Sequence, residues 1–180
     1  MSIETEKKYH LTFEQKQFVL DALEEIGAQF VGEDFEENTL YGGGILDDKR
    51  AVLRVRRIEG KTILTYKERV KNDSDIKHQI EFETIVENAE EIESIIKSLG
   101  FTKALVYEKR RKTWRFRDVE IMLDELPFGL YMEIEGAIPA IAEAEILLNA
   151  ESFETEHETY PHLTKRFGVR KENLIEARFA

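Results

Sequence analysis

The feature of this chain that most constrains its fold is an alternation of charged and apolar residues along successive extended segments. Neighbouring side chains of a strand point to opposite faces, so such segments build a sheet with one apolar and one charged face. In the segment 50–58, for example, Arg54 and Arg56 share a face opposite Leu53 and Val55. Seven predicted strands carry charge on one face, and long aliphatic side chains are scarce there.

The predicted elements are mostly strands that follow one another as hairpins. We expect strands at residues 3–11, 30–41, 50–58, 61–69, 77–87, 103–117, 119–125 and 130–136. Helices are expected after the N-cap residues Thr12 and Asn88 and from Pro139 through Leu148. The tail, 161–179, is predicted to be helical in two pieces. Because most strands follow each other directly, the sheet should be mainly antiparallel.

The charged side of this sheet can be an open wet face or the inside of a closed barrel. A single pair of charges on a strand is usually only solvated. The recurrence across strands favours closure, which also removes the exposed sheet edges. Removing charges from water costs free energy unless they are paired or bind a ligand, so a charged interior implies a highly charged ligand. Arg and Lys would hold phosphate oxygens, and carboxylates from several strands would bind Mg²⁺ or Mn²⁺.

Composition removes several other classes of function. The chain has 180 residues, no Cys and a net charge of −11. The missing thiols exclude disulfides and thiolate metal sites, and the acidic balance argues against a partner that is a nucleic-acid polymer. We find no apolar run of membrane-spanning length and no signal peptide, so we expect a single domain over 1–180, no membrane partner and a cytoplasmic location. The net charge does not exclude a small polyanion.

An ordered set of motifs resembles one known family. Glu4 to Lys8 reads E-x-E-x-K, which resembles the N-terminal signature of the CYTH superfamily, the triphosphate tunnel metalloenzymes. This superfamily includes class IV adenylyl cyclases, thiamine triphosphatases and inorganic triphosphatases. Its later landmarks follow in order at 53–56, 65–67, 81–83, 109–111, 123–125 and 133–135. The spacing is most similar to the class IV cyclase branch.

The resemblance implies a fold and a set of site residues. The fold would be α+β and dominated by β, a closed eight-stranded antiparallel barrel with a charged interior and helices outside. The implied metal ligands are Glu4, Glu6, Glu81, Glu83, Asp124, Glu133 and Glu135, for one or two ions of Mg²⁺ or Mn²⁺. The implied triphosphate contacts are Lys8, Arg54, Arg56, Lys67, Lys109 and Arg111. Lys8 and Asp124 would also act catalytically.

The function we expect is cleavage of a phosphoanhydride bond in a small triphosphate-bearing substrate, acting as a triphosphatase. A class IV adenylyl cyclase that makes cyclic AMP and pyrophosphate from ATP is the alternative. A non-catalytic module that binds polyphosphate or a nucleotide is a second alternative, and an adaptor barrel a third. The sequence leaves open whether the chain forms a homodimer and whether His10 or Arg115 lines the site.

Overall fold

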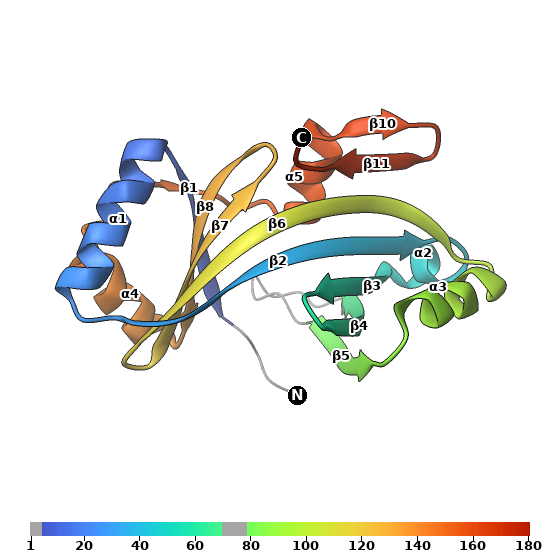
Figure 1. Cartoon of the computed structure of the whole chain (residues 1–180), viewed down its shortest axis with the longest axis horizontal. Helices are drawn as coiled ribbons and strands as arrows, with labels where there is room; N and C mark the ends of the chain where they lie inside the picture. The colour runs from blue at the N-terminus through green and yellow to red at the C-terminus, as the bar shows by residue number, and fades with distance from the viewer. Residues whose placement is uncertain (1–4, 70–78) are drawn as a thin grey trace. The chain divides into compact units, whose positions relative to one another are not determined.

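The computed structural model describes residues 5–69 and 79–180, so the predicted metal ligand Glu4 and residues 70–78 lie outside the described residues. The described part holds five helices and eleven strands (Figure 1). The strands are β1 (Glu6–Leu11), β2 (Gln29–Gly42), β3 (Ala51–Ile58), β4 (Lys61–Arg69), β5 (Gln79–Val86), β6 (Thr102–Phe116), β7 (Val119–Leu126), β8 (Gly129–Gly136), β9 (Glu154–Thr155), β10 (Val169–Lys171) and β11 (Leu174–Ala177). The helices are α1 (Phe13–Glu25), α2 (Ile45–Lys49), α3 (Ala89–Ser98), α4 (Ile138–Leu147) and α5 (Tyr160–Phe167).

The strands form a mostly antiparallel sheet, as the hairpin pattern predicts. Its order is β5-β4-β3-β2-β6-β7-β8-β1-β9, and β11 pairs with β6 in parallel. Among the described residues, hydrogen bonds do not join β5 to β9 at the two ends of this order. The eight predicted strands and their mainly antiparallel pairing are therefore confirmed, β9, β10 and β11 are additional short strands, and closure into a barrel is not shown.

The chain divides into two compact units, which we describe separately. The β3–β5 unit contains Glu36–Glu108 and Tyr160–Ala180, apart from the undescribed 70–78. The β7–β8 unit contains the described residues up to Phe35 together with Lys109–Thr159. Strands β2 and β6 contribute residues to both units.

The β7–β8 unit has the larger apolar core, which α1 and α4 build together with β1, β6, β7 and β8. Helix α1 begins at a complete capping box, in which the Gln15 amide N–H donates to Thr12 Oγ1 at 3.2 Å and the Thr12 N–H donates to Gln15 Oε1 at 2.8 Å. The buried core side chains include Tyr9, Val19, Leu23, Trp114, Ile121, Met132, Ile134 and Leu148. This core fixes one face of the four strands and leaves the charged side chains on the other.

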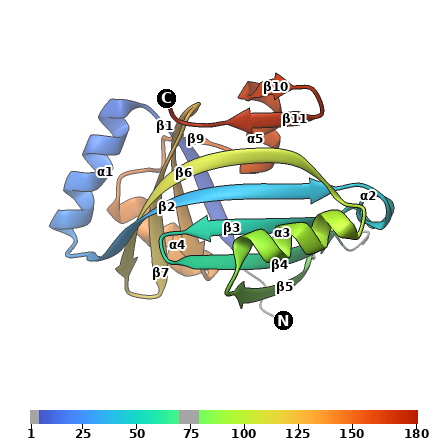
Figure 2. The same cartoon turned by 45° about the vertical axis from the view of Figure 1, so that its right-hand side comes forward.

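The β3–β5 unit has a smaller core under α3. The Glu91 amide donates to Asn88 Oδ1 at 3.0 Å, so Asn88 caps the helix as its sequence position predicts. Tyr41, Val55 and Ile96 are buried where α3 packs on β3, and Figure 2 shows α3 in front of this part of the sheet. The face of β3 and β4 that α3 covers carries Leu53, Val55 and Leu64, which leaves Arg54 and Arg56 on the opposite face.

The tail differs from the sequence prediction beyond Gly168. The first predicted helix is present as α5, but the second is wrong, because Val169–Ala177 form the hairpin β10–β11. Strand β11 pairs in parallel with Leu105–Tyr107 of β6, an interaction with a distant segment that overrides local helix propensity. Arg178 then donates to Glu37 of β2 at 2.5 Å and to Glu108 of β6 at 2.9 Å.

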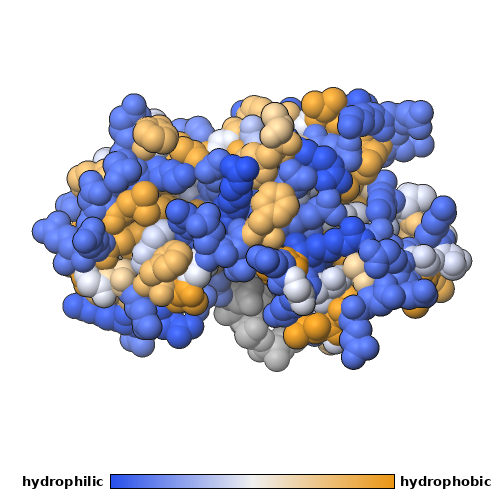
Figure 3. Space-filling view, in the orientation of Figure 1, coloured by the Kyte–Doolittle hydropathy of each residue, from blue (hydrophilic) through white to orange (hydrophobic). Residues whose placement is uncertain are grey.

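The surface seen in Figure 3 carries hydrophobic side chains in separate patches among hydrophilic ones. Exposed aromatic residues, among them Phe13 and Phe82, lie in both units. Within the described ranges, every helix is too short or too polar to span a bilayer.

Candidate functional site

Strand register aligns the predicted site residues of the β7–β8 unit in rows. Residues directly opposite each other on neighbouring strands share a face of the sheet. Asp124 on β7 is opposite Arg111 on β6, and Glu133 on β8 is opposite Lys8 on β1. Two residues further along β8, Glu135 is opposite Glu6. Residues from four different strands thus form one charged face.

Arg111 is the centre of this face. Its Nε donates to Asp124 Oδ1 at 2.7 Å and its Nη2 donates to Asp124 Oδ2 at 2.5 Å, which is a bidentate pair. Nη2 also donates to Glu133 Oε2. The Asp124 side chain is fully buried and that of Glu133 is 6 % exposed, so the guanidinium supplies the positive charge that their burial requires.

Two lysines complete the cluster. Lys8 Nζ lies 3.2 Å from Glu133 Oε1 and donates to the Glu158 backbone carbonyl at 3.3 Å. Lys109 Nζ lies 3.6 Å from Asp124 Oδ2. Both lysines are buried. The cluster therefore has three cations for two buried carboxylates and carries a local excess of positive charge suited to an anionic guest.

The carboxylates of Glu6 and Glu135 form the part of this face that could hold a metal. They are register partners on β1 and β8, and like charges directly opposite each other destabilise a sheet unless something compensates them. Mg²⁺ is commonly held by one or two protein carboxylates and completes its shell with water and phosphate oxygens. The pair fits this ion in chemistry. Within the described residues no group of three metal-binding side chains is formed, and Glu4, the remaining predicted ligand here, lies outside them.

The β3–β5 unit holds the other predicted cations. Arg54 is opposite Thr65 on β4, and Thr65 is opposite Glu83 on β5. Arg54 Nη2 donates to Thr65 Oγ1 at 3.3 Å, Thr65 donates to Glu83 Oε2 at 3.0 Å, and Nη2 lies 3.7 Å from the same carboxylate oxygen. Burial, followed by the positive charge of Arg56, lowers the pKa of Arg54.

Lys67 is the third predicted cation of this unit and lies at its more open end. Its Nζ is 2.8 Å from Glu81 Oε2, and the two residues are register partners on β4 and β5. Both side chains are about one-third exposed (30 % and 29 %). Glu81 and Glu83, which the resemblance assigns to a metal, each lie beside a cation of their own unit.

Two polar residues of this face were missed in the sequence analysis. Glu36 and Asn38 on β2 are 3 % and 1 % exposed, and Asn38 is the register partner of Arg56. Glu36 Oε2 lies 3.8 Å from Arg56 Nε and accepts a hydrogen bond from Asn38 Nδ2 at 3.2 Å. The sequence signal for them is their spacing: residues two apart on a strand point to the same side, as Arg54 and Arg56 do on the neighbouring strand.

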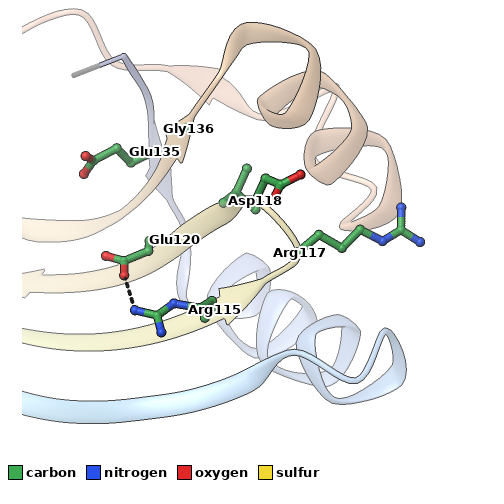
Figure 4. A pocket seen from close by; sticks show the side chains of 7 residues that line it. Arg115, Arg117, Asp118, Glu120, Glu135 and Gly136 are labelled. Atoms are coloured by element: carbon green, nitrogen blue, oxygen red, sulfur yellow. Dashed lines mark hydrogen bonds and ion pairs between the residues drawn. The ribbon is translucent and has the colours of Figure 1, made fainter. Parts of the chain in front are cut away.

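The two side chains that the sequence left open lie at opposite ends of the β7–β8 unit's charged face. Arg115 is 59 % exposed and donates to Glu120 at 2.9 Å. It lines a cavity of about 340 Å³ with Arg117, Asp118, Val119, Glu120, Glu135 and Gly136. Figure 4 shows Arg115 turned toward Glu120, while Arg117 points away from both. His10 is half-exposed, its Nδ1 lies 3.6 Å from Glu154 Oε2, and its ring is tilted against that of Tyr131 with 5.3 Å between the ring centroids.

Comparison with known proteins matches residues 2–173 to the CYTH domain family. A Methanocaldococcus jannaschii protein named "Putative adenylate cyclase" is 30 % identical over 177 residues, which cover 96 % of this chain and 94 % of the relative.

Solved structures share the fold. The PH1012 protein of Pyrococcus horikoshii is 26 % identical, with a TM-score of 0.74 over 89 % of this chain and 99 % of its own. HpAC1 from Hippeastrum, whose description pairs the name "Putative adenylyl cyclase" with a dominant triphosphatase activity, is 17 % identical. Its TM-score is 0.71 over 93 % of this chain and 98 % of its own. At that identity the likeness concerns the fold alone.

Proposed function

The chain belongs to the CYTH domain family, and from this premise we propose that it is a divalent-metal-dependent enzyme that hydrolyses a triphosphate-bearing substrate. The observation that carries the proposal is the cluster around Arg111. Three cations and two buried carboxylates there share a sheet face with the Glu6–Glu135 pair. A face that combines phosphate-binding cations with hard oxygen ligands suits a metal–triphosphate complex.

The roles follow from the chemistry of each group. The triphosphate contacts are Lys8, Arg54, Arg56, Lys67, Lys109 and Arg111, which offset the charge of the substrate. Glu6, Glu133 and Glu135 with Glu4 would hold a Mg²⁺ or Mn²⁺ ion, which neutralises charge on phosphate oxygens when bound. Glu81 and Glu83 are candidates for a second ion. Their contacts to Lys67 and Arg54 equally support a role in orienting those cations.

In the proposed reaction a water oxygen forms a bond to the terminal phosphorus. The bond from that phosphorus to the bridging oxygen breaks, and the leaving group keeps the bridging oxygen and its electron pair. Asp124, which accepts two hydrogen bonds from Arg111, and Lys8, beside Glu133, would orient the attacking water and the terminal phosphate; their fixed positions support these roles. We also propose that the sheet closes into the eight-stranded tunnel of the family, within a single domain over 1–180.

A second reaction has support of its own. The Methanocaldococcus jannaschii relative is named as an adenylate cyclase. In that reaction the ribose 3′-hydroxyl of ATP attacks the α-phosphorus, and cyclic AMP and pyrophosphate result. The same phosphate and metal groups would serve both reactions, because they differ in the nucleophile and in the phosphorus attacked.

Product analysis separates these reactions. The protein is incubated with Mg²⁺ or Mn²⁺ and, separately, with ATP, thiamine triphosphate and inorganic triphosphate. We expect orthophosphate from at least one of the three and none after chelation with EDTA. Cyclic AMP with pyrophosphate would select the cyclase, and binding without product would select a non-catalytic role.

A pair of variants tests the metal assignment. Glu135→Gln keeps the shape of the side chain but removes a carboxylate, so we expect roughly a 10-fold rise or more in the metal concentration that gives half-maximal turnover. Glu143→Gln is the matched control, because Glu143 is exposed on α4 and pairs with Arg117 away from the register row of Glu135. An equal metal requirement in both variants would remove Glu135 from the metal site.

A further inference from the structure

Strand β2 places a carboxylate and an amide inside the charged face of the β3–β5 unit. Glu36 and Asn38 are two residues apart and both are almost fully buried. Asn38 is directly opposite Arg56, and Leu40 is directly opposite Arg54, so both polar residues share the face of the two arginines. Neither residue belongs to the set that the family resemblance assigns.

A buried carboxylate needs compensation, since taking its charge out of water is costly. One cation beside it is Arg56, whose Nε lies 3.8 Å from Glu36 Oε2. This distance is an ion pair but too long for a hydrogen bond. Asn38 Nδ2 reaches the same oxygen at 3.2 Å. Glu36 is thus oriented by Asn38 and attracts Arg56 through charge.

Two further polar atoms of this group could form hydrogen bonds that the structure does not show. Arg56 Nε and Asn38 Oδ1 are buried, and neither has a hydrogen-bond partner within the part of the chain that the structure describes. This arginine donor and this amide acceptor belong to register partners on β3 and β2. A buried polar group without a hydrogen bond is energetically unfavourable. This arrangement therefore favours an Arg56 side chain that takes a fixed position when a phosphate binds its outer nitrogens.

The neighbouring arginine explains why a carboxylate is needed here. Arg54 and Arg56 lie on the same face of one strand, where each positive charge disfavours the other. Burial and the positive charge of Arg56 lower the pKa of Arg54, whereas the negative charge of Glu36 raises it. Glu36 therefore acts as a counter-ion of Arg56. Its effect on the pKa of Arg54 adds to the larger ones of Tyr107 and Glu81.

We propose that Glu36 and Asn38 are positioning residues: Asn38 orients Glu36, and the charge of Glu36 draws the Nε side of Arg56 toward it and so directs the Nη1 and Nη2 groups toward a phosphate of the substrate. This inference rests on the proposed function, because it assumes a polyphosphate ligand. The Arg56 side chain keeps 22 % exposure although its Nε is buried, which leaves its outer nitrogens accessible. An arginine that is already oriented loses less conformational entropy when it binds a phosphate than an arginine that rotates freely.

The test compares Glu36→Gln and Glu36→Ala with Glu37→Gln. The glutamine variant at position 36 keeps a hydrogen-bond acceptor for Asn38 but loses the charge, and the alanine variant loses both. Glu37 is the adjacent residue on the opposite face, where it pairs with Arg57 and Arg178, so its variant removes the same charge outside the site. Binding of inorganic triphosphate is measured by calorimetry with Mg²⁺, together with KM, kcat and the melting temperature of each variant.

We expect Glu36→Ala to raise Kd and KM for triphosphate roughly 10-fold, Glu36→Gln to raise them less, and kcat to stay within about 2-fold. Glu37→Gln should leave Kd and KM unchanged whatever its melting temperature. If the Glu36 variants lose only thermal stability and bind triphosphate as the wild type does, Glu36 is a structural residue and the inference is wrong.

A spectroscopic readout separates this inference from the proposed function. The Nε–H signal of Arg56 in a ¹H–¹⁵N NMR spectrum reports the environment of that nitrogen without any substrate. We expect it to move or broaden in Glu36→Gln and to stay in place in Glu37→Gln. A wild type without triphosphate binding or turnover would refute the proposed function. An Arg56 signal unchanged by Glu36→Gln would refute the positioning role.

Discussion

The charged faces of the two units use the same residue types in different ways. In the β7–β8 unit, Arg111 makes short hydrogen bonds to two buried carboxylates. In the β3–β5 unit, Arg54 and Arg56 face their carboxylates at 3.7 and 3.8 Å. The side chains of the first cluster are fixed by hydrogen bonds to one another and therefore stabilise the folded state. The two arginines of the second contact their carboxylates mainly through charge, so they can adjust to a ligand at a smaller structural cost than Arg111.

The sharpest test of this contrast is Arg111→Ala. It would remove the shared counter-ion of Asp124 and Glu133 and leave only Lys109 and Lys8 beside them, so the cost approaches but does not exceed the roughly 3–5 kcal/mol of a fully uncompensated buried charge. We expect a large fall in the free energy of unfolding and loss of turnover, measured by denaturant titration and by product release. Arg110→Ala is the control, since Arg110 is exposed and pairs with Glu125. Equal stability of the two variants would contradict the locked character of the first cluster.

Arg54→Ala probes the looser cluster. A hydrogen bond to a charged group contributes about 1.5–3 kcal/mol, so KM for the triphosphate should rise roughly 10- to 100-fold. The melting temperature should change much less than in Arg111→Ala, because Arg54 makes longer contacts. Arg57→Ala, on the same strand and the opposite face, provides the comparison. Should Arg54→Ala destabilise the protein as strongly as Arg111→Ala, the distinction between the clusters would fail.

The smallest expected effect is the acid response of the C-terminal hairpin, which belongs to the β3–β5 unit. Hydrogen bonds from Lys171 and Arg178 lower the pKa of Glu176 below its ordinary value of 4.5. The stabilisation is therefore present above that value and is lost as pH falls through the lowered pKa. Glu176→Gln should cost at most about 1 kcal/mol at pH 7 and less below about pH 4. Melting temperatures of wild type and variant across this range would show the difference narrowing, and a constant gap would argue against the ion pairs.

Local signals account for most of what the sequence predicts correctly. The caps at Thr12 and Asn88 form as their spacing indicates, and the alternation in β3, β7 and β8 places the charges on the expected face. Pairing register is a different matter, because it depends on contacts between distant segments. Nothing in the spacing of Arg111, Asp124 and Glu133 shows that one guanidinium reaches both carboxylates.

The errors have the same physical origin. The residues after Gly168 form a hairpin because β11 adds to β6, a strand far earlier in the chain, with Glu172 in a left-handed turn (φ 54°). Glu36 and Asn38 were missed because both faces of β2 carry polar residues, such as Glu37 and Thr39, so alternation alone does not mark an inner face. Their burial becomes evident only once β3 is placed beside them.

The anchoring of Arg178 affects how this protein should be shortened or tagged. The family match ends at residue 173, so a chain trimmed to it would lose β11 and this arginine. Glu37, which accepts a hydrogen bond from Arg178, is the neighbour of Glu36 on β2. Trimming would thus remove the pairing of β11 with β6 together with the Arg178 contacts, and the instability of such a fragment could be mistaken for the loss of a functional residue. Fusion partners are better attached through a spacer after Ala180, with the tail kept intact.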